Sequence, residues 1–159
     1  MVNQKYSSKN TSVNKNKLPS TSKKVHWKKY IGQKVLDIGG GKFNNLKDWL
    51  KLNYNIELYI YDKYNRSEEE NIKALNIKPS LVICNNVLNV IDNDNVIKEI
   101  VQNIEKYDRD FVISVYEGDR KGEGKVSKKD CYQRNQKLKD YVKFFDSDVK
   151  IVNGMICNV

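Results

Sequence analysis

A run of three glycines that follows Asp37 carries the strongest chemical signal in the sequence. Residues 34–44 read Lys-Val-Leu-Asp-Ile-Gly-Gly-Gly-Lys-Phe-Asn, a short apolar stretch that breaks into glycines. Such a loop lets the backbone come close to a ligand at the start of a helix. A dinucleotide-binding fingerprint would need another glycine where Asn44 stands, so that fingerprint is incomplete.

Two acids indicate which ligand this loop would take. Asp37 lies two residues before Gly39, where its carboxylate would repel the pyrophosphate of NAD and attract an ammonium group. Asp62 ends the next apolar run and could accept hydrogen bonds from ribose hydroxyls. S-adenosylmethionine carries an ammonium group and a ribose but no phosphate, so the two acids fit it better than NAD. An NAD-type dehydrogenase is the disfavoured alternative, and a glycine turn whose acids only cap loops is another.

The elements that must position these residues alternate between strands and helices. Apolar runs predict strands at residues 34–38, 56–61, 80–84 and 111–116. Helical patterns predict helices at 43–52 and 130–145, and helices that begin at the capping residues Ser67 and Asp92. Asn153-Gly154 between two apolar pieces predicts a closing hairpin. The order predicts an α/β fold: a Rossmann-like, mostly parallel sheet with helices on both faces and a C-terminal antiparallel β-hairpin.

On these residues the chain resembles class I S-adenosylmethionine-dependent methyltransferases. Residues 35–41 are similar to the first motif of that family, and Ile60-Tyr61-Asp62 is similar to the second. The resemblance covers residues 34–159 and implies that the glycine loop surrounds the methionine part of the cofactor while Asp62 holds the ribose. The cofactor-binding residues that it implies are Asp37, Gly39, Gly40, Gly41, Asp62, Lys63, Asn85, Asn86 and Val87.

Other segments are similar to narrower groups within this family. Residues 61–66, 116–119 and 132–135 together resemble small methyltransferase-like proteins encoded by phages. Residues 85–91 are similar to a segment after the fourth family strand, especially in methyltransferases associated with DNA phosphorothioation. The resemblance implies methyl transfer in the cytoplasm, which is the host cytoplasm if the chain is phage-encoded.

The sequence also departs from the family. The usual sheet has seven strands, whereas the interval from Asp62 to Ser80 leaves room for one helix and hardly another strand. We therefore expect a sheet trimmed relative to the seven-strand methyltransferase fold. An Asp-Pro-Pro-Tyr motif is absent where residues 84–87 stand, and so is a Pro-Cys nucleophile. Methylation of nucleobase amines and of cytosine carbon is disfavoured, and the acceptor, nucleic acid or small molecule, stays unassigned.

Four residues are candidates to orient or deprotonate the methyl acceptor: Asn86, Glu117, Asp119 and Tyr132. Each also has a structural alternative, since Asn86 could cap a turn, Tyr132 could belong to the core, and the two acids could be solvated loop residues. Residues 117–124 hold three glycines among charges, which suits either a mobile lid or a plain surface loop.

The positive charge of the chain is concentrated near its amino terminus. The formal net charge is +9, and the first 30 residues hold eight lysines and no acid, so the rest is nearly neutral. Residues 1–24 are polar enough to predict a disordered basic tail, which leaves 25–159 as one domain. The tail could be a solubilising terminus, or it could contact nucleic-acid phosphates. The second hypothesis is therefore a non-catalytic, methyltransferase-like module that binds nucleic acid through its tail.

Composition disfavours several other classes of protein. Three separated cysteines and one histidine support neither a disulfide framework nor a zinc site. We expect no metal, with carboxylates that hold a hard ion as the alternative. No apolar run is long enough to span a membrane, and the start of the chain lacks the apolar segment of a secretory signal, so we expect a cytoplasmic protein. The sequence does not indicate an oligomeric state.

Overall fold

The computed structural model describes residues 5–6, 17–127 and 130–158. The strands in this part of the chain are β1 (Lys34–Ile38), β2 (Glu57–Tyr61), β3 (Leu81–Asn85), β4 (Asp110–Ser114), β5 (Lys125–Val126), β6 (Tyr132–Gln133), β7 (Lys150–Val152) and β8 (Met155–Cys157). The α-helices are α1 (Asn45–Tyr54), α2 (Glu68–Leu75) and α3 (Asp94–Glu105). Short 3₁₀ helices are η2 (Ser20–Lys23), η3 (Trp27–Tyr30), η4 (Leu88–Val90) and η5 (Leu138–Phe144).

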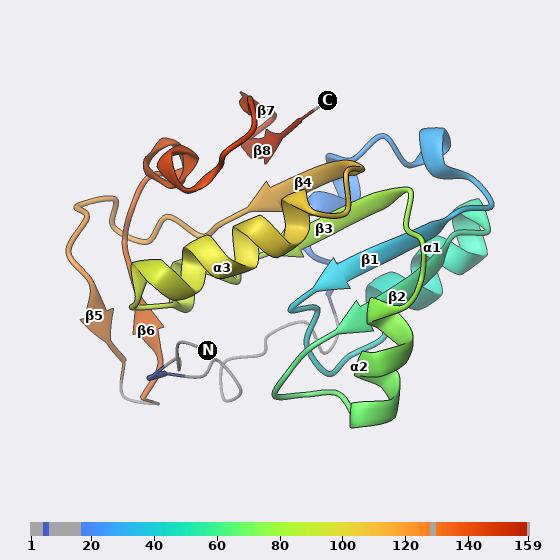
Figure 1. Ribbon diagram of the computed structural model, residues 1–159, viewed down its shortest axis with the longest axis horizontal. Helices are drawn as coiled ribbons and strands as arrows, with labels where there is room; N and C mark the ends of the chain where they lie inside the picture. The colour runs from blue at the N-terminus through green and yellow to red at the C-terminus, as the bar shows by residue number, and fades with distance from the viewer. Residues whose placement is uncertain (1–4, 7–16, 128–129, 159) are drawn as a thin grey trace.

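Six of these strands form one sheet in the order β2-β1-β3-β4-β8-β7, and β5 and β6 form a separate antiparallel pair (Figure 1). Strands β1 to β4 pair in parallel, whereas β8 is antiparallel to β4 and β7 is antiparallel to β8. The predicted α/β fold with a mostly parallel sheet and a closing hairpin is confirmed. Asn153 and Gly154 both have positive φ, as the two-residue hairpin turn requires.

The strand order reverses direction between β1 and β3. From β1 the chain passes through α1 to β2 on one side, and then through α2 to β3 on the other side of β1. In open sheets of this kind, ligands bind beyond the carboxyl ends of the strands at such a switch point. The fold therefore predicts a ligand site at the residues that end β1 and β3.

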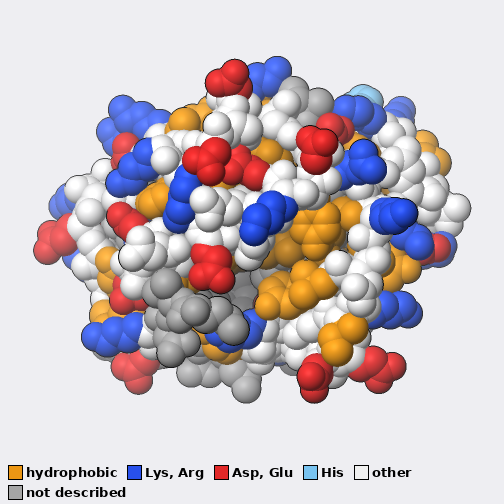
Figure 2. All heavy atoms as spheres, in the orientation of Figure 1, with side chains coloured by type: hydrophobic (Ala, Val, Ile, Leu, Met, Phe, Trp, Pro, Cys, Tyr) orange, Lys and Arg blue, Asp and Glu red, His pale blue; other side chains and the backbone are white. Residues whose placement is uncertain are grey.

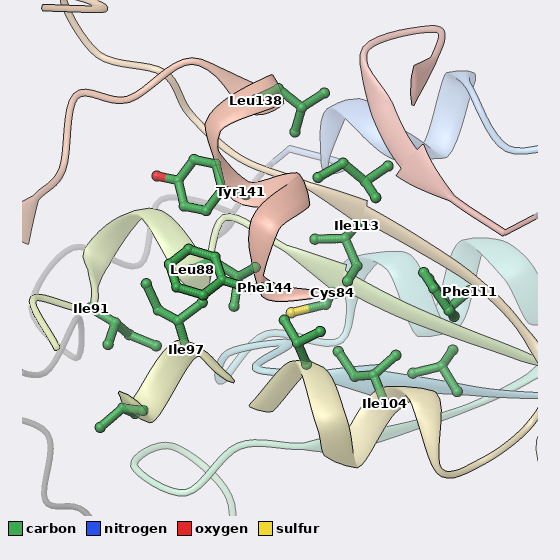
Figure 3. Packing of buried hydrophobic residues seen from close by; sticks show 14 of the residues in the cluster. Cys84, Leu88, Ile91, Ile97, Ile104, Phe111, Ile113, Leu138, Tyr141 and Phe144 are labelled. Carbon is green, nitrogen blue, oxygen red and sulfur yellow. The ribbon is translucent and has the colours of Figure 1, made fainter. Parts of the chain in front are cut away.

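Two hydrophobic clusters cover the two faces of the sheet. Alternate residues of the strands point to opposite sides, so Leu36 and Val82 join one cluster while Val35 and Leu81 join the other. Side chains of α3 and η5 pack on the first face, where they meet those of β3 and β4 (Figure 3). Helix α1 and η3 pack on the second face. The expectation of helices on both faces is confirmed, and this packing fixes the ends of the central strands.

Local start signals decide where the helices begin. The predicted capping box is confirmed, because Ser67 accepts a hydrogen bond from the backbone N–H of Glu70 and the Glu70 carboxylate accepts one from the backbone of Ser67. The predicted cap of α3 is wrong by one residue. Asn93, rather than Asp92, holds the start of α3 by accepting a hydrogen bond from the backbone N–H of Asn95 at 2.8 Å.

The helix predicted at residues 130–145 is wrong over its first half. Only Leu138–Phe144 is helical, as η5, and Tyr132 and Gln133 form β6 instead. Asp130 and Asn135 both have positive φ, which is incompatible with a right-handed helix through them. The apolar spacing that suggested a long helix therefore describes η5 alone.

The packed part of the chain begins before residue 25. Ser20–Lys23 form η2, Thr21 and Ser22 are buried, and the indole N–H of Trp27 donates to the carbonyl of Ser22 at 3.0 Å. These residues fall within the span 1–24 that was predicted to be a disordered tail, and residues 5–6 and 17–24 of that span are described. The prediction for residues 1–4 and 7–16 lies outside the described residues.

The charged side chains of the visible face are mixed in sign. Figure 2 shows lysine and arginine side chains interspersed with acidic ones over the face seen in Figure 1. This mixture fits a folded part whose net charge is close to zero.

Within the described residues, no helix has the length and apolar character needed to cross a membrane.

Candidate functional site

A small cavity lies at the carboxyl ends of β1 and β3, where the strand order reverses. Its walls include Asp37 and Asn85, which are at these strand ends, together with Gly39 and Gly40 of the glycine loop. Pro19 also lines it, so the segment before η2 closes one side. The space that remains is about 40 Å³, room for only a few water molecules.

Asp37 is the most unusual ionisable group at this site. Its side chain is only 5% exposed, and Oδ1 has no hydrogen-bond partner within the described part of the chain. Burial, together with the nearby negative charge of Asp62, raises the pKa of Asp37 to about 7, and the Arg66 guanidinium limits that rise. A buried carboxylate with an unsatisfied oxygen is costly for the fold, and a cationic ligand would relieve that cost.

Asn85 presents the complementary unsatisfied group. Its Oδ1 accepts a hydrogen bond from the Ser114 hydroxyl at 2.8 Å, which leaves Nδ2 as the atom that must find an acceptor. Among the described residues, this buried Nδ2 finds none. The cavity is thus lined by one residue with a spare acceptor and one with a spare donor. An amino acid group, with its ammonium and its carboxylate, could satisfy both.

Asp62 fastens the glycine loop to the turn that follows β2. Its Oδ2 accepts a hydrogen bond from the backbone N–H of Gly41 at 2.8 Å. Its Oδ1 accepts from the backbone N–H groups of Tyr64 and Asn65 and from the Asn65 side chain, at 3.0 to 3.1 Å. Because these four bonds use most of the acceptor capacity of a carboxylate, Asp62 positions the loop. Its predicted hydrogen bonds to a ribose stay a prediction.

Arg66 holds the other side of the glycine loop, and sequence reasoning gave it no role. Its guanidinium donates to the carbonyls of Gly41 and Phe43 at 2.7 and 3.0 Å and to the Asn44 side chain at 2.8 Å. The side chain is only 7% exposed. Nothing in a single sequence distinguishes such a buried arginine from a surface one, because its partners lie more than 20 residues away.

Asn71 is a second residue to which sequence reasoning gave no role. It lies on α2, and its side chain bonds both backbone groups of Asp62, accepting from the N–H at 2.9 Å and donating to the carbonyl at 3.1 Å. This pair of bonds fixes the end of β2, and with it the carboxylate that holds Gly41.

The glycines of the loop are required by the chain's own packing. Gly39 has a φ of +75°, and a Cβ on it would overlap Cγ2 of Val87. A Cβ on Gly40 would lie 2.6 Å from Oδ2 of Asp37. Close approach of a ligand, which the sequence suggested as the reason for these glycines, is not needed to explain these two. Val87, one of the predicted cofactor-binding residues, packs against Gly39, and its cofactor contact stays a prediction.

Two of the predicted cofactor-binding residues keep their side chains away from the cavity wall. Lys63 is exposed, with its ammonium 5.5 Å from the ring centre of Tyr64. Asn86 is exposed and has a φ of 55°, and its backbone N–H donates to the carbonyl of Ser114 at 2.9 Å. Asp37, Gly39, Gly40 and Asn85 are therefore the predicted residues that line the cavity.

Glu117 and Asp119, two of the catalytic candidates, have structural contacts. Glu117 accepts a hydrogen bond from the backbone N–H of Leu138 at 2.7 Å, which holds the start of η5. Asp119 accepts one from the backbone N–H of Lys121 at 2.9 Å, and this bond and the nearby Lys125 lower the pKa of Asp119. A lowered pKa makes Asp119 a weaker base.

Asn135 ties the loop of residues 117–124 to the strand pair. Its side chain donates to the carbonyl of Glu123 at 2.9 Å, and its own carbonyl accepts from the N–H of Gly122 at 2.8 Å. Tyr132, the remaining catalytic candidate, is half-buried on β6, and a Cβ on Gly124 would overlap its hydroxyl. These contacts fasten the loop at several points to the segment that contains β6.

The described residues contain no group of three or more histidine, cysteine or acidic side chains that could hold a metal ion. No protein-family model and no curated protein matches the chain. What the site can do therefore follows from its geometry: it offers a buried acidic acceptor and an amide donor at the switch point of a parallel sheet.

Proposed function

We propose that the chain is an S-adenosylmethionine-dependent methyltransferase. The observation that carries the proposal is the pair of unsatisfied buried atoms at the cavity, Asp37 Oδ1 and Asn85 Nδ2. They end neighbouring strands at the switch point, where ligands of such sheets bind. The amino acid part of S-adenosylmethionine carries an ammonium for Asp37 and a carboxylate for Asn85.

The electrostatics of the site favour this cofactor over NAD. Asp37 and Asp62 are both buried near the glycine loop, and each raises the cost of placing a further negative charge there. The backbone N–H of Gly41, which could otherwise bind a phosphate, donates to Asp62. A pyrophosphate would therefore meet two carboxylates, whereas an ammonium group would gain from both.

The topology supports the same proposal. Class I methyltransferases have a seven-stranded Rossmann-like sheet that an antiparallel pair closes. The sheet here has six strands and the same kind of closing pair, and the segment between β2 and β3 contains α2 alone. We interpret the fold as that sheet without one edge strand, beyond β2.

The chain's own residues would bind and position the cofactor. When bound, S-adenosylmethionine supplies a methyl group on a sulfonium. Asp37 and Asn85 would hold its amino acid part, while Arg66 and Asp62 keep the loop in place. Small-molecule sites usually enclose about 300 to 1,000 Å³, far more than the cavity of about 40 Å³. The segment Lys17–Pro19, which closes the cavity, must therefore move aside.

Positioning, rather than a strong base, would then supply most of the catalysis. Asp119 is exposed and has a lowered pKa, and Glu117 is bonded to the start of η5. Alignment of an acceptor with the methyl carbon can lower a barrier substantially without proton abstraction. An acceptor that is nucleophilic at neutral pH suits such a site best.

The test is equilibrium dialysis of the protein against methyl-labelled S-adenosylmethionine. The variant Asp37→Asn keeps the shape of the side chain and removes its charge, so it should bind at least tenfold more weakly. Asp48→Asn is the matched control, because Asp48 is an exposed residue of α1 and does not line the cavity. Equal binding by the wild type and Asp37→Asn would refute the proposed role of Asp37.

A further inference from the structure

The amino-terminal segment places an aromatic ring on Tyr132. The rings of Tyr6 and Tyr132 are stacked, with centroids 5.6 Å apart and planes inclined by 10°. Tyr6 is the only aromatic residue among the first 25 residues, which are otherwise polar and lysine-rich. The same segment closes the cavity through Lys17 and Pro19. It therefore contacts the cofactor-site cavity at one point and β6 at another.

The Tyr132 ring is held in place before anything stacks on it. Tyr132 pairs with Val126 across the β5–β6 ladder, and Gly124 packs against its hydroxyl. The next residue, Gln133, accepts a hydrogen bond from the Asn89 side chain at 3.0 Å and donates to the carbonyl of Tyr116 at 2.9 Å. A ring fixed in this way loses little entropy when a second ring stacks on it.

The η4 segment links Tyr132 to the proposed methyl-transfer site. Asn89 belongs to η4, which follows directly after Asn85, Asn86 and Val87 at the end of β3. Its carbonyl accepts a hydrogen bond from the backbone N–H of Arg134, two residues beyond Tyr132. The platform and the cavity are thus joined through one short segment.

We infer that Tyr132 is the platform on which a base of a single-stranded nucleic acid stacks, and that Tyr6 occupies this place in the free protein. Aromatic side chains bind the bases of single strands by stacking, and lysines follow the phosphates. This inference rests on the proposed function, because it names the class of methyl acceptor for the same site.

The charge of the segment favours a nucleic acid over an aromatic peptide. The first 30 residues hold eight lysines and no acid, and the described ones from Lys17 to Lys29 are exposed. A nucleic acid gains binding free energy from this charge, because the lysines release counterions from its phosphates. An aromatic peptide without such a charge density gains nothing comparable. Among the described lysines, Lys5 places its ammonium 5.2 Å from the ring centre of Tyr6, and Lys17 lines the cavity.

The experiment measures fluorescence anisotropy of the full chain with a labelled single-stranded DNA of 12 nucleotides. The probe control is an abasic strand of the same length, which keeps the phosphates and lacks the bases. Tyr132→Ala should weaken binding of the intact strand about fivefold or more, whereas Tyr132→Phe, which keeps the ring, should bind like the wild type. Tyr6→Ala removes the occupant of the platform and should tighten binding.

Equal affinity for the intact and abasic strands would overturn the inference, because charge alone would then explain binding. An unchanged affinity in Tyr132→Ala would overturn it too, as would the absence of strand binding or a preference for a tyrosine-containing peptide. If Tyr132→Ala does not fold, the affinities of the wild type and of Tyr6→Ala for the intact and the abasic strand decide the question.

A separate titration with S-adenosylmethionine distinguishes the two proposals. Cofactor binding without any preference for bases would overturn the platform and leave the proposed function standing. A preference for bases without cofactor binding would overturn the proposed function and leave Tyr132 as a nucleic-acid contact.

Discussion

Replacing Asp37 with asparagine should stabilise the protein at neutral and alkaline pH while it removes cofactor binding. Asp37 is buried beside Asp62, and its Oδ1 lacks a partner in the described structure, so its negative charge is costly to the folded state. Asparagine has nearly the same shape and no charge. The variant therefore separates the cost of the charge from the packing of the side chain.

The size of the effect follows from the pKa of Asp37. Folding raises this pKa from 3.8 to about 7. Between these values the folded protein holds a proton that the unfolded chain has released, so the free energy of unfolding falls as pH rises. The loss reaches about 4 kcal/mol at pH 8, of which about 2 to 3 kcal/mol arises between pH 5 and pH 8. The Asp37→Asn variant lacks this loss.

The assay is urea unfolding of the wild type and Asp37→Asn at pH 5, 6, 7 and 8, with the difference in unfolding free energy plotted against pH. The difference should grow in favour of the variant as pH rises. A difference that stays constant from pH 5 to pH 8 would refute the reasoning, since it would mean that Asp37 titrates alike in both states.

Asp110→Asn is the matched control and should act in the opposite direction. Burial alone would raise the pKa of Asp110, but hydrogen bonds from Lys29 and Tyr30 bring it below the ordinary value. A lowered pKa contributes stability above the unfolded value and loses it as pH falls. Asp110→Asn should therefore destabilise the protein at pH 7, and a stabilising effect would contradict this assignment.

Three further substitutions test how the glycine loop and α2 are held. Gly39→Ala should lower the free energy of unfolding by about 1 to 2 kcal/mol from its left-handed backbone alone, and by more because the new methyl group overlaps Val87. Adding Val87→Ala should therefore recover part of the thermal stability. No recovery would count against the contact between Gly39 and Val87. Arg66→Met should lower both the midpoint of thermal unfolding and S-adenosylmethionine affinity, because the carbonyl of Gly41 loses the hydrogen bond that Arg66 donates. An unchanged midpoint would show that the loop does not need Arg66. Ser67→Ala removes a capping box and should cost about 1 kcal/mol in urea unfolding, and a loss near zero would argue against the cap.

The central sheet could be predicted from the sequence because buried parallel strands appear as short apolar runs. The runs at 34–38 and 80–84 correspond closely to β1 and β3, and the Asn-Gly turn gave the closing hairpin. The residues that end these strands could be predicted for the same reason. Asp37 and Asn85 line the cavity because the ends of parallel strands meet at one edge of a sheet.

The contacts that hold the site could not be predicted, because they depend on how the fold places residues that carry no local sequence signal. Arg66 and Asn71 look like ordinary polar residues until the fold brings the glycine loop and the end of β2 to them. Asn135 interrupts a helical pattern because its side chain bonds the carbonyl of Glu123 and its backbone is left-handed. The place of Pro19 at the cavity likewise follows from the packing of η2 and has no local signal.

The most direct test of the central claim is a calorimetric titration of the full chain with S-adenosylmethionine, with NAD titrated in parallel. The proposed site predicts that S-adenosylmethionine binds and that NAD does not, because Asp37 and Asp62 attract an ammonium group and repel a pyrophosphate. Binding of NAD would contradict this account of the site. Binding of neither would contradict the proposed function and would favour the alternative of a nucleic-acid-binding module.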